Sequence, residues 1–423
     1  IGIDAGTSGM RACAINAQTE ILADVSTAFP PPQHNGDQIS QDPHIWSQAM
    51  FLLFEDLSTQ IDLQQVAAIS IDGTSGTVLL CDKTGEPLTP ALMYNDASSQ
   101  AKLEFVRQAC PDLPIVHSVA AGLPKLLQLA DHVAHDNVAY AMHQADWLGC
   151  LLTHQPGHSD ANNCLKTGFD AVGHNWPDCI ARLTPINNWL PKVHRSGEDI
   201  AQINAKVAAR TGLSARAILR AGTTDSTAAV IATGASQIGD AITSLGSTMV
   251  MKVISDRPVH DAASGVYSQP YGKRWLVGGG SNSGGAVLRQ FFSDEQMVRL
   301  SVTINPDKDS GLDYYPLPNR GERFPINDVT MQPRLTPKPN DDGLFLQGLL
   351  EGMARIEQRA YQRLAELGAP FPTSVRTVGG GAVNQKWAAI RQRYLGVPVL
   401  DCHQQSTAFG SALIAMQQTV TRS

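Results

Sequence analysis

Short turns built from glycine and hydroxyl residues recur between apolar segments of this chain, and they limit the folds that it can adopt. The apolar start is followed by Asp4-Ala5-Gly6-Thr7-Ser8-Gly9, and the motif recurs as Asp72-Gly73-Thr74-Ser75-Gly76. A related strand–turn–strand pattern spans residues 242–253. An internal repeat of this kind predicts one supersecondary unit used more than once. We therefore expect a duplicated α/β domain with a cleft between the copies.

The first third of the chain has the pattern of an α/β domain with a mixed sheet. Three short strands are predicted over residues 1–29, and a helix is predicted to begin at Asp42 or Pro43. Residues 66–71 form the next predicted strand, with Val78–Cys81 as its partner after the turn. This βββαβ order is typical of an α/β fold.

The remaining two thirds are predicted to contain more helix and longer loops. Residues 97–220 are expected to be mostly helical, with a polar loop over residues 158–174. A long amphipathic helix is predicted for Gly343–Leu367, because its apolar residues recur at helical spacing. Gly368 is its expected C-terminal cap.

Composition excludes several classes of protein. The 423 residues are 43% hydrophobic and 17% charged, which is globular, and the length suggests two or three domains. The net charge of −7 and the lack of a basic stripe argue against a nucleic-acid partner. The apolar runs fall short of the ~20 residues that span a bilayer, so no membrane partner is expected. Seven scattered cysteines without a Cys-x-x-Cys motif favour a reducing compartment, the cytoplasm or the plastid stroma.

Two of the glycine-rich turns are suited to holding phosphate. In the turn after Asp4, backbone N–H groups and the hydroxyls of Thr7 and Ser8 can act as donors, and Asp4 can hold Mg²⁺ through water. It is not a Walker P-loop, because a strand follows instead of Gly-Lys-Ser/Thr and a helix. The second turn is Gly246-Ser247-Thr248. Either turn could instead close an ordinary hairpin.

Three further groups of residues suggest ligand contacts. Gly379-Gly380-Gly381 lies between a predicted strand and helix, where a flat ring could approach the backbone and Asn384 could bind a base or ribose. Asp225 begins a predicted helix, so it is either an N-cap or a carboxylate that accepts a substrate proton. The third group consists of short polar residues at strand ends, which either bind a polyol or cap turns: Asp72, Ser75 and Asp96.

The order of these motifs resembles that of the FGGY carbohydrate kinases, within the actin/Hsp70/sugar-kinase superfamily. The resemblance covers essentially the whole chain and rests on Asp4–Ser8, Asp72–Gly76, Tyr94–Asp96, Ser159–Asn162, Gly222–Asp225, Leu245–Thr248 and Gly379–Asn384. It implies an α/β protein with two RNase-H-like (actin-like ATPase) domains flanking a deep cleft. Residues 1–222 would bind the sugar and residues 223–423 would bind ATP.

The same resemblance implies a role for each motif. Asp225 would be the general base, and Asp4 would help to hold Mg²⁺. Thr7, Ser8, Gly246, Ser247 and Thr248 would contact phosphates. Gly379, Gly380, Gly381, Asn384 and Trp387 would hold the nucleotide. Asp4, Asp72, Ser75, Asp96 and Asp225 would contact the sugar.

Departures from the family pattern indicate the substrate. Gln128 stands where a Trp is usual, and Leu92-Met93-Tyr94-Asn95 lacks another common Trp. With the short length, these features resemble the cyanobacterial and plant-plastid members described as xylulokinase-like or D-ribulose kinases. We expect phosphorylation of a pentulose by ATP with Mg²⁺, D-ribulose first and D-xylulose second, by a monomer or homodimer. The alternatives are a pseudokinase that only binds sugar or nucleotide, and an actin- or chaperone-like ATPase.

Overall fold

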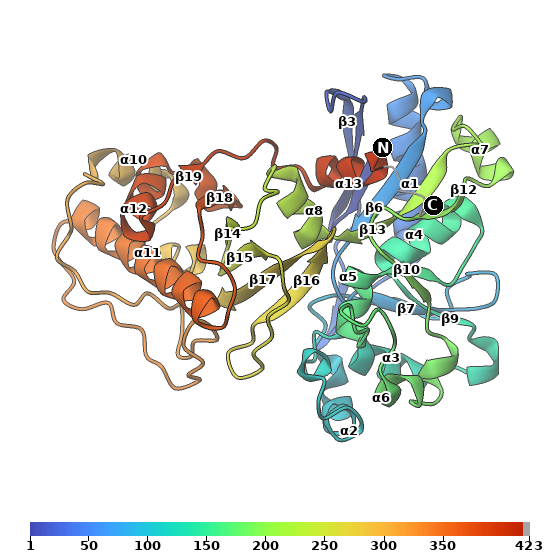
Figure 1. Ribbon diagram of the computed structural model, residues 1–423, viewed down its shortest axis with the longest axis horizontal. Coiled ribbons are helices and arrows are strands. Elements are labelled where there is room, and N and C mark those ends of the chain that lie inside the picture. Colours follow the sequence, from blue (N-terminus) through green and yellow to red (C-terminus); the bar gives the residue numbers. More distant parts are fainter. Residues whose placement is uncertain (418–423) are drawn as a thin grey trace. The chain divides into compact units, whose positions relative to one another are not determined.

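The computed structural model describes residues 1–417 and contains two compact units, which Figure 1 shows with their elements labelled. The first unit consists of Ile1–Ala232 together with the segment that begins at Gln404, and the second consists of Thr233–His403. The chain therefore leaves the first unit once and returns to it near its end.

This division differs from the sequence-based boundary at residue 222, which assigned everything after it to the second domain. Helix α8 (Asp225–Ala232) and helix α13 (Thr407–Met416) pack on each other within the first unit. Their contact is close, because a Cβ on Gly410 would lie 2.0 Å from the carbonyl oxygen of Ala228. Asp225 therefore belongs to the first unit.

The main sheet of the first unit has three parallel strands at its centre. In spatial order its strands are β12 (Asp199–Gln202), β13 (Ile218–Thr224), β6 (Ala68–Gly73), β1 (Gly2–Ala5), β2 (Gly9–Ile15) and β3 (Ile21–Ala28). Strands β13, β6 and β1 run parallel, whereas β12, β2 and β3 pair antiparallel to their neighbours. The carboxyl ends of β13, β6 and β1 therefore meet at one edge of the sheet.

Helices cover both faces of this sheet. Successive side chains along β2 point to opposite faces, so they contact different helices. Ala12 and Ala14 pack in the core cluster that contains Trp46 of α1 (Pro43–Ser58). Cys13, between them, points to the opposite face and packs with Phe409 of α13. Helix α1 begins at Pro43 with Asp42 as its N-cap, as the sequence predicted.

The partner expected for the 66–71 strand is wrong. Strand β7 (Val78–Cys81) does not pair with β6, because β1 and β13 already occupy both edges of β6. It belongs instead to a separate sheet, in the order β4 (Gln33–Asn35), β5 (Gln38–Gln41), β8 (Ala91–Leu92), β7 and β9 (Tyr140–His143). The turn after Asp72 thus carries the chain from one sheet to the other.

The middle of the first unit contains short helices rather than long ones. They are α2 (Leu103–Ala109), α3 (Gly122–Ala130), α4 (Gln144–Thr153), α5 (Ala161–Cys164), α6 (Asp178–Ala181) and α7 (Ala205–Thr211). The predicted loop over residues 158–174 contains β10 (His158–Asp160), α5 and the 3-10 helix η5 (Leu165–Thr167); β10 pairs with β11 (Lys192–His194). Short polar residues there form buried hydrogen bonds instead of a solvated loop.

The second unit repeats the topology of the first. Its strands, in spatial order, are β16 (Tyr267–Tyr271), β17 (Arg274–Ser281), β15 (Met249–Ser255), β14 (Asp240–Leu245), β18 (Ser374–Val378) and β19 (Val399–Leu400). Strand β14 pairs antiparallel with β15 and parallel with β18, just as β1 pairs with β2 and β6. The turn 246–248 is therefore the counterpart of the turn 6–8, whereas Asp72 ends a strand of the same sheet as Asp4.

The helices of the second unit are dominated by α11. They are α9 (Gly285–Leu288), α10 (Asp294–Thr303), α11 (Asp342–Glu366) and α12 (Gln385–Leu395). Helix α11 packs its apolar face into the core of this unit, as the spacing of its apolar residues predicted. Its C-cap is Leu367, and Gly368 follows in the left-handed conformation at φ +105°.

Candidate active site

Three carboxyl groups lie at the carboxyl ends of the central parallel strands of the first unit. Asp4 on β1 is the register partner of Asp72 on β6, which in turn pairs with Thr223 on β13. Asp225 follows directly, as the first residue of α8. In open α/β sheets, this edge is where ligands bind. The sequence singled out all three residues, and the sheet brings them together.

Asp72 is the most deeply buried carboxyl group of this cluster. Its side chain is fully buried, and Oδ2 accepts a hydrogen bond of 2.5 Å from Ser411 of α13. Burial and the charge of Asp4 place the pKa of Asp72 well above its usual range, and Asp225 adds to this rise. Its Oδ1 accepts no hydrogen bond from the described residues. A raised pKa favours the neutral form of Asp72, whose strand pairs with that of Asp4.

Asp4 is held from two sides but retains a little exposure. Thr407 of α13 donates a hydrogen bond to its Oδ2, and Nη1 of Arg11 lies 3.8 Å from the same oxygen. The residue is 8% exposed, whereas Asp72 is fully buried. Within residues 1–417, no group of three His, Cys, Asp or Glu side chains is arranged to hold a metal ion by itself. Asp4 nevertheless fits Mg²⁺, which takes one or two carboxylates and fills its shell with water and phosphate oxygens.

The turn after Asp4 is tight and presents polar atoms outward. The N–H of Gly6 donates to the carbonyl of Gly9 at 3.0 Å, which closes the turn. Thr7 is half-buried and Ser8 is exposed, so both hydroxyls can reach a ligand. The backbone around them is anchored, because the carbonyl of Ser8 accepts from the N–H of Phe29 at 3.1 Å. The backbone of this turn is therefore held in place while its two hydroxyls stay accessible.

Lys166 is a candidate site residue that the sequence analysis did not single out. It lies in η5, and its Nζ donates to the carbonyl of Ser75 at 3.4 Å, which places it against the turn after β6. Burial lowers the pKa of Lys166, and the charge of Asp225 opposes that shift. The sequence Lys166-Thr167-Gly168 matches no recognisable motif. The position of Lys166 in the site therefore depends on the tertiary fold.

Asp96 and Asp72 expose no surface in this structure. Asp96 accepts from the N–H of Ile39 at 2.7 Å and from the hydroxyl of Ser98 at 2.8 Å, so both of its oxygens hold the chain. Beside it, the buried Lys125 donates to the carbonyl of Met93 at 2.6 Å, and burial lowers the pKa of Lys125 to about 7. Direct contact of Asp96 or Asp72 with a sugar stays a prediction, and the geometry favours supporting roles for both.

In the second unit, the two glycine-containing turns lie side by side. Val378 at the end of β18 is the register partner of Ser244 on β14, so the loop 379–384 and the turn 246–248 leave the sheet at the same edge. A Cβ on Gly379 would lie 2.8 Å from the carbonyl oxygen of Leu245, so only glycine allows this approach. Gly246 and Ser247 are exposed and Thr248 is half-buried.

The predicted nucleotide contacts fall into exposed and buried groups. A Cβ on Gly380 would have no heavy atom within 4 Å, so this position faces open space. Asn384 instead caps α12, because its Oδ1 accepts from the N–H of Trp387 at 3.0 Å, and its Nδ2 donates to Ser301 at 2.9 Å. Trp387 is 3% exposed and packs beneath Gly381. Both residues shape the loop from below.

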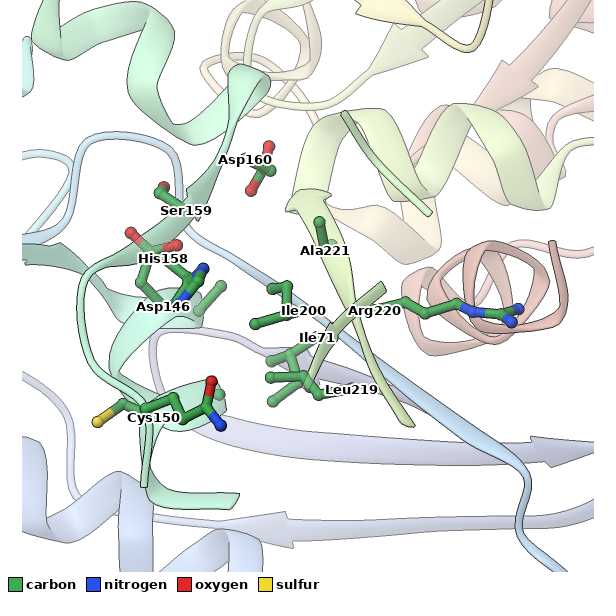
Figure 2. Close-up of a pocket in the computed structure, with 14 residues that line it drawn as sticks. Ile71, Asp146, Cys150, His158, Ser159, Asp160, Ile200, Leu219, Arg220 and Ala221 are labelled. Carbon is green, nitrogen blue, oxygen red and sulfur yellow. The ribbon is translucent and has the colours of Figure 1, made fainter. Parts of the chain in front are cut away.

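A small pocket lies between α4, β10 and β13 of the first unit, with Asp146, His158, Ser159 and Asp160 along one side (Figure 2). It offers about 20 Å³ to water-sized molecules, which is about the room for one water and too little for a sugar. Burial and the charge of Asp146 raise the pKa of Asp160 to about 7.

The repeated topology, with a glycine-containing turn at the same edge of each sheet, defines a two-domain α/β protein of the actin-like ATPase fold. A solved xylulose kinase from Lactobacillus acidophilus matches it with a TM-score of 0.85 and 20% identity, over 98% of this chain and 88% of that one. Among the described residues, no helix is both long enough and apolar enough to cross a membrane.

Comparison with family models identifies the protein family to which this chain belongs. The N-terminal domain model of the FGGY family of carbohydrate kinases matches residues 1–232, and the C-terminal domain model matches residues 241–419. A xylulose kinase of Bacillus subtilis is 26% identical over 98% of this chain and 87% of its own length. An L-fuculokinase of Escherichia coli is 24% identical over 97% of this chain and 90% of its own. The chain belongs to the FGGY family and is an ATP-dependent sugar kinase.

Proposed function

We propose that this kinase transfers the terminal phosphoryl group of ATP to a hydroxyl of a pentulose, D-ribulose in preference to D-xylulose. The observation that carries the reaction type is the cluster of Asp4, Asp72 and Asp225 beside the tight turn 6–8. Similarity to proteins named xylulose kinase supports a five-carbon ketose. The preference for D-ribulose rests on the departures at Tyr94 and Gln128. Gln128 donates to Ser98 at 2.8 Å, and Ser98 donates in turn to Asp96.

In this proposal the first unit carries the base, the metal ligand and the sugar contacts. Asp225 takes the proton of the attacking hydroxyl, a role worth roughly 10²–10⁴ in rate. Lys166 and Ser75 bind sugar oxygens beside it. Asp4 holds Mg²⁺, which when bound neutralises charge on the transferring phosphates. Thr7 and Ser8 donate hydrogen bonds to the transferring group, because phosphoryl transfer depends mainly on positioning and charge.

The second unit binds the nucleotide in this proposal. Ser247 and Thr248 contact the phosphates together with the N–H of Gly246. The adenosine lies on the loop 379–381, which Asn384 and Trp387 support from beneath. The anionic phosphates would thus meet backbone donors at the end of parallel strands, where such groups bind well.

The loop 379–381 allows a prediction about nucleotide binding that does not depend on the sugar site. We expect Gly380→Val to raise the dissociation constant for ATP about tenfold or more, because the new side chain occupies the space assigned to the adenosine. The change should leave the melting temperature nearly unaltered, since the added Cβ meets no protein atom. Isothermal calorimetry with ATP, and separately with the sugar, measures the dissociation constants, and thermal unfolding followed by circular dichroism measures the melting temperature. Gly381→Val is the contrasting variant, because its Cβ would collide with Leu245 and Trp387 at 2.7 Å and destabilise the unit. Unchanged ATP affinity in Gly380→Val would show that the adenosine binds elsewhere.

Substrate choice is tested by coupled ADP release with ATP and Mg²⁺ against D-ribulose, D-xylulose, L-fuculose, gluconate, glycerol and a no-sugar blank. The two pentuloses differ only in the configuration at C3, and a site that hydrogen-bonds one hydroxyl rejects a misplaced one strongly. We expect kcat/KM for D-ribulose to exceed that for D-xylulose by about tenfold or more. The reverse order would make this a xylulose kinase. ATP hydrolysis that no sugar stimulates, together with calorimetric sugar binding, would instead indicate a pseudokinase.

A further inference from the structure

A buried chain of hydrogen bonds runs from the start of α4 to η5. Nδ1 of His143 lies 2.7 Å from Oδ2 of Asp146, and Nε2 of the same ring lies 3.0 Å from Oγ1 of Thr167. His143 is 2% exposed and Thr167 is 1% exposed. Because the carboxylate can only accept, Nδ1 donates to Asp146, and Nε2 is hydrogen-bonded to the Thr167 hydroxyl. Asp146 thereby orients the ring against Thr167.

Thr167 is the residue directly after Lys166, and its surroundings leave it little freedom. It is the last residue of η5, and Gly168 ends that turn with φ +105°. On its other side α3 packs closely, because a Cβ on Gly122 would lie 2.6 Å from the Thr167 Oγ1. The hydroxyl of Thr167 therefore locks the backbone from which the Lys166 side chain extends.

Lys166 depends on such an anchor because its own contacts are few. Its Nζ donates one long hydrogen bond of 3.4 Å to the carbonyl of Ser75, and its stem passes Gly76. The charged groups that act on it are Asp225, which attracts the ammonium, and Lys125, which repels it. A lysine side chain has four rotatable bonds, so a fixed backbone is needed to keep the ammonium at one place.

We propose that His143 and Thr167 are positioning residues, which hold the Lys166 ammonium against the carbonyl of Ser75 at the turn after β6 without contacting substrate. The inference rests on the proposed function for its consequence in catalysis, because Lys166 matters to turnover only if it binds the sugar. The positioning itself is a property of the free protein and can be measured without substrate.

The first experiment measures how fast a lysine reagent modifies Lys166 in the full-length protein. Limited acetic anhydride followed by peptide mass mapping gives the rate for Lys166, with Lys125 as the buried reference. We expect Thr167→Val to raise the Lys166 rate about fivefold, the factor that corresponds to loss of one hydrogen bond. Thr167→Ser keeps the hydroxyl and should restore the original rate. An unchanged rate in Thr167→Val, with Thr167→Ser equal to it, would overturn the proposal.

Ser159→Ala is the matched control. Ser159 Oγ lies 3.2 Å from Nδ1 of the same imidazole, so this variant removes a hydroxyl from His143 and leaves the contact between Nε2 and Thr167 in place. We expect it to change the Lys166 rate less than twofold. An equal acceleration in Ser159→Ala and Thr167→Val would mean that general loosening of the core, not the link through Thr167, controls Lys166.

A kinetic cycle separates this inference from the proposed function. If Thr167 acts through Lys166, Thr167→Val lowers kcat/KM for the sugar about tenfold or more in the natural protein, with KM for ATP unchanged. In a Lys166→Met background the same change should have less than a twofold effect. Equal losses in both backgrounds would overturn the positioning role. If Lys166→Met alone is fully active while Thr167→Val still accelerates modification, the sugar contact is wrong and the positioning stands.

Discussion

Replacing Asp225 by asparagine is expected to lower kcat by roughly 10²–10⁴ and leave the binding of ATP and sugar nearly unchanged. An amide cannot take the proton of the attacking hydroxyl, yet it has the shape of the carboxylate. In the natural protein, Oδ1 of Asp225 accepts a hydrogen bond of 2.6 Å from the N–H of Ser226. The amide oxygen of asparagine can accept the same hydrogen bond, so α8 should begin normally. Coupled ADP release gives kcat, and calorimetry gives both dissociation constants.

The control for this variant is Asp42→Asn. Asp42 is exposed and accepts from the N–H of His44 at 2.9 Å at the start of α1, so the substitution makes the same chemical change at another helix start. It should leave kcat within twofold of the natural value. Sugar-dependent turnover by Asp225→Asn within tenfold of the natural protein would show that another group removes the proton.

The second large effect concerns stability, and it involves an ion pair inside the second unit. Nε and Nη2 of Arg391 each lie 2.7 Å from an oxygen of Glu357, and both side chains are 1% exposed. Arg391 also donates to Thr377 at 2.6 Å. We expect Arg391→Met to reduce the free energy of unfolding by about 3–5 kcal/mol, because Glu357 is left as a buried charge without its partner. Urea unfolding followed by circular dichroism measures the loss.

A double variant and an exposed pair complete this test. Arg391→Met combined with Glu357→Met should recover most of the lost stability, since two apolar side chains replace two buried charges. Arg182→Met breaks an ion pair with Asp178 whose side chains are 80% and 85% exposed, and it should change stability little. A loss in the double variant as large as in Arg391→Met would mean that Arg391 contributes mainly through packing and Thr377.

The sequence predicted the type of reaction better than it predicted the contacts that surround each candidate residue. Asp4, Asp225 and the turns at 6–8 and 246–248 could be singled out because strand-ending carboxylates and glycine-rich turns have local signatures. Lys166 could not, since a single lysine in an irregular segment has no pattern. At Asn384 and Asp96 the sequence suggested a ligand contact, which stays a prediction, whereas the structure shows these side chains capping α12 and anchoring a loop.

Local patterns by themselves determined the strands, the long helix and the glycine-rich turns, because side-chain periodicity and the conformational freedom of glycine act over a few residues. Which strands become neighbours depends instead on contacts between distant segments. Strand β6 lies between β1 and β13, so β7 pairs in another sheet, and α13 returns from the end of the chain to donate hydrogen bonds to Asp4 and Asp72. Only the tertiary structure decides that the pKa of Asp72 is raised and where Lys166 lies, because burial and charge proximity are properties of the packed fold.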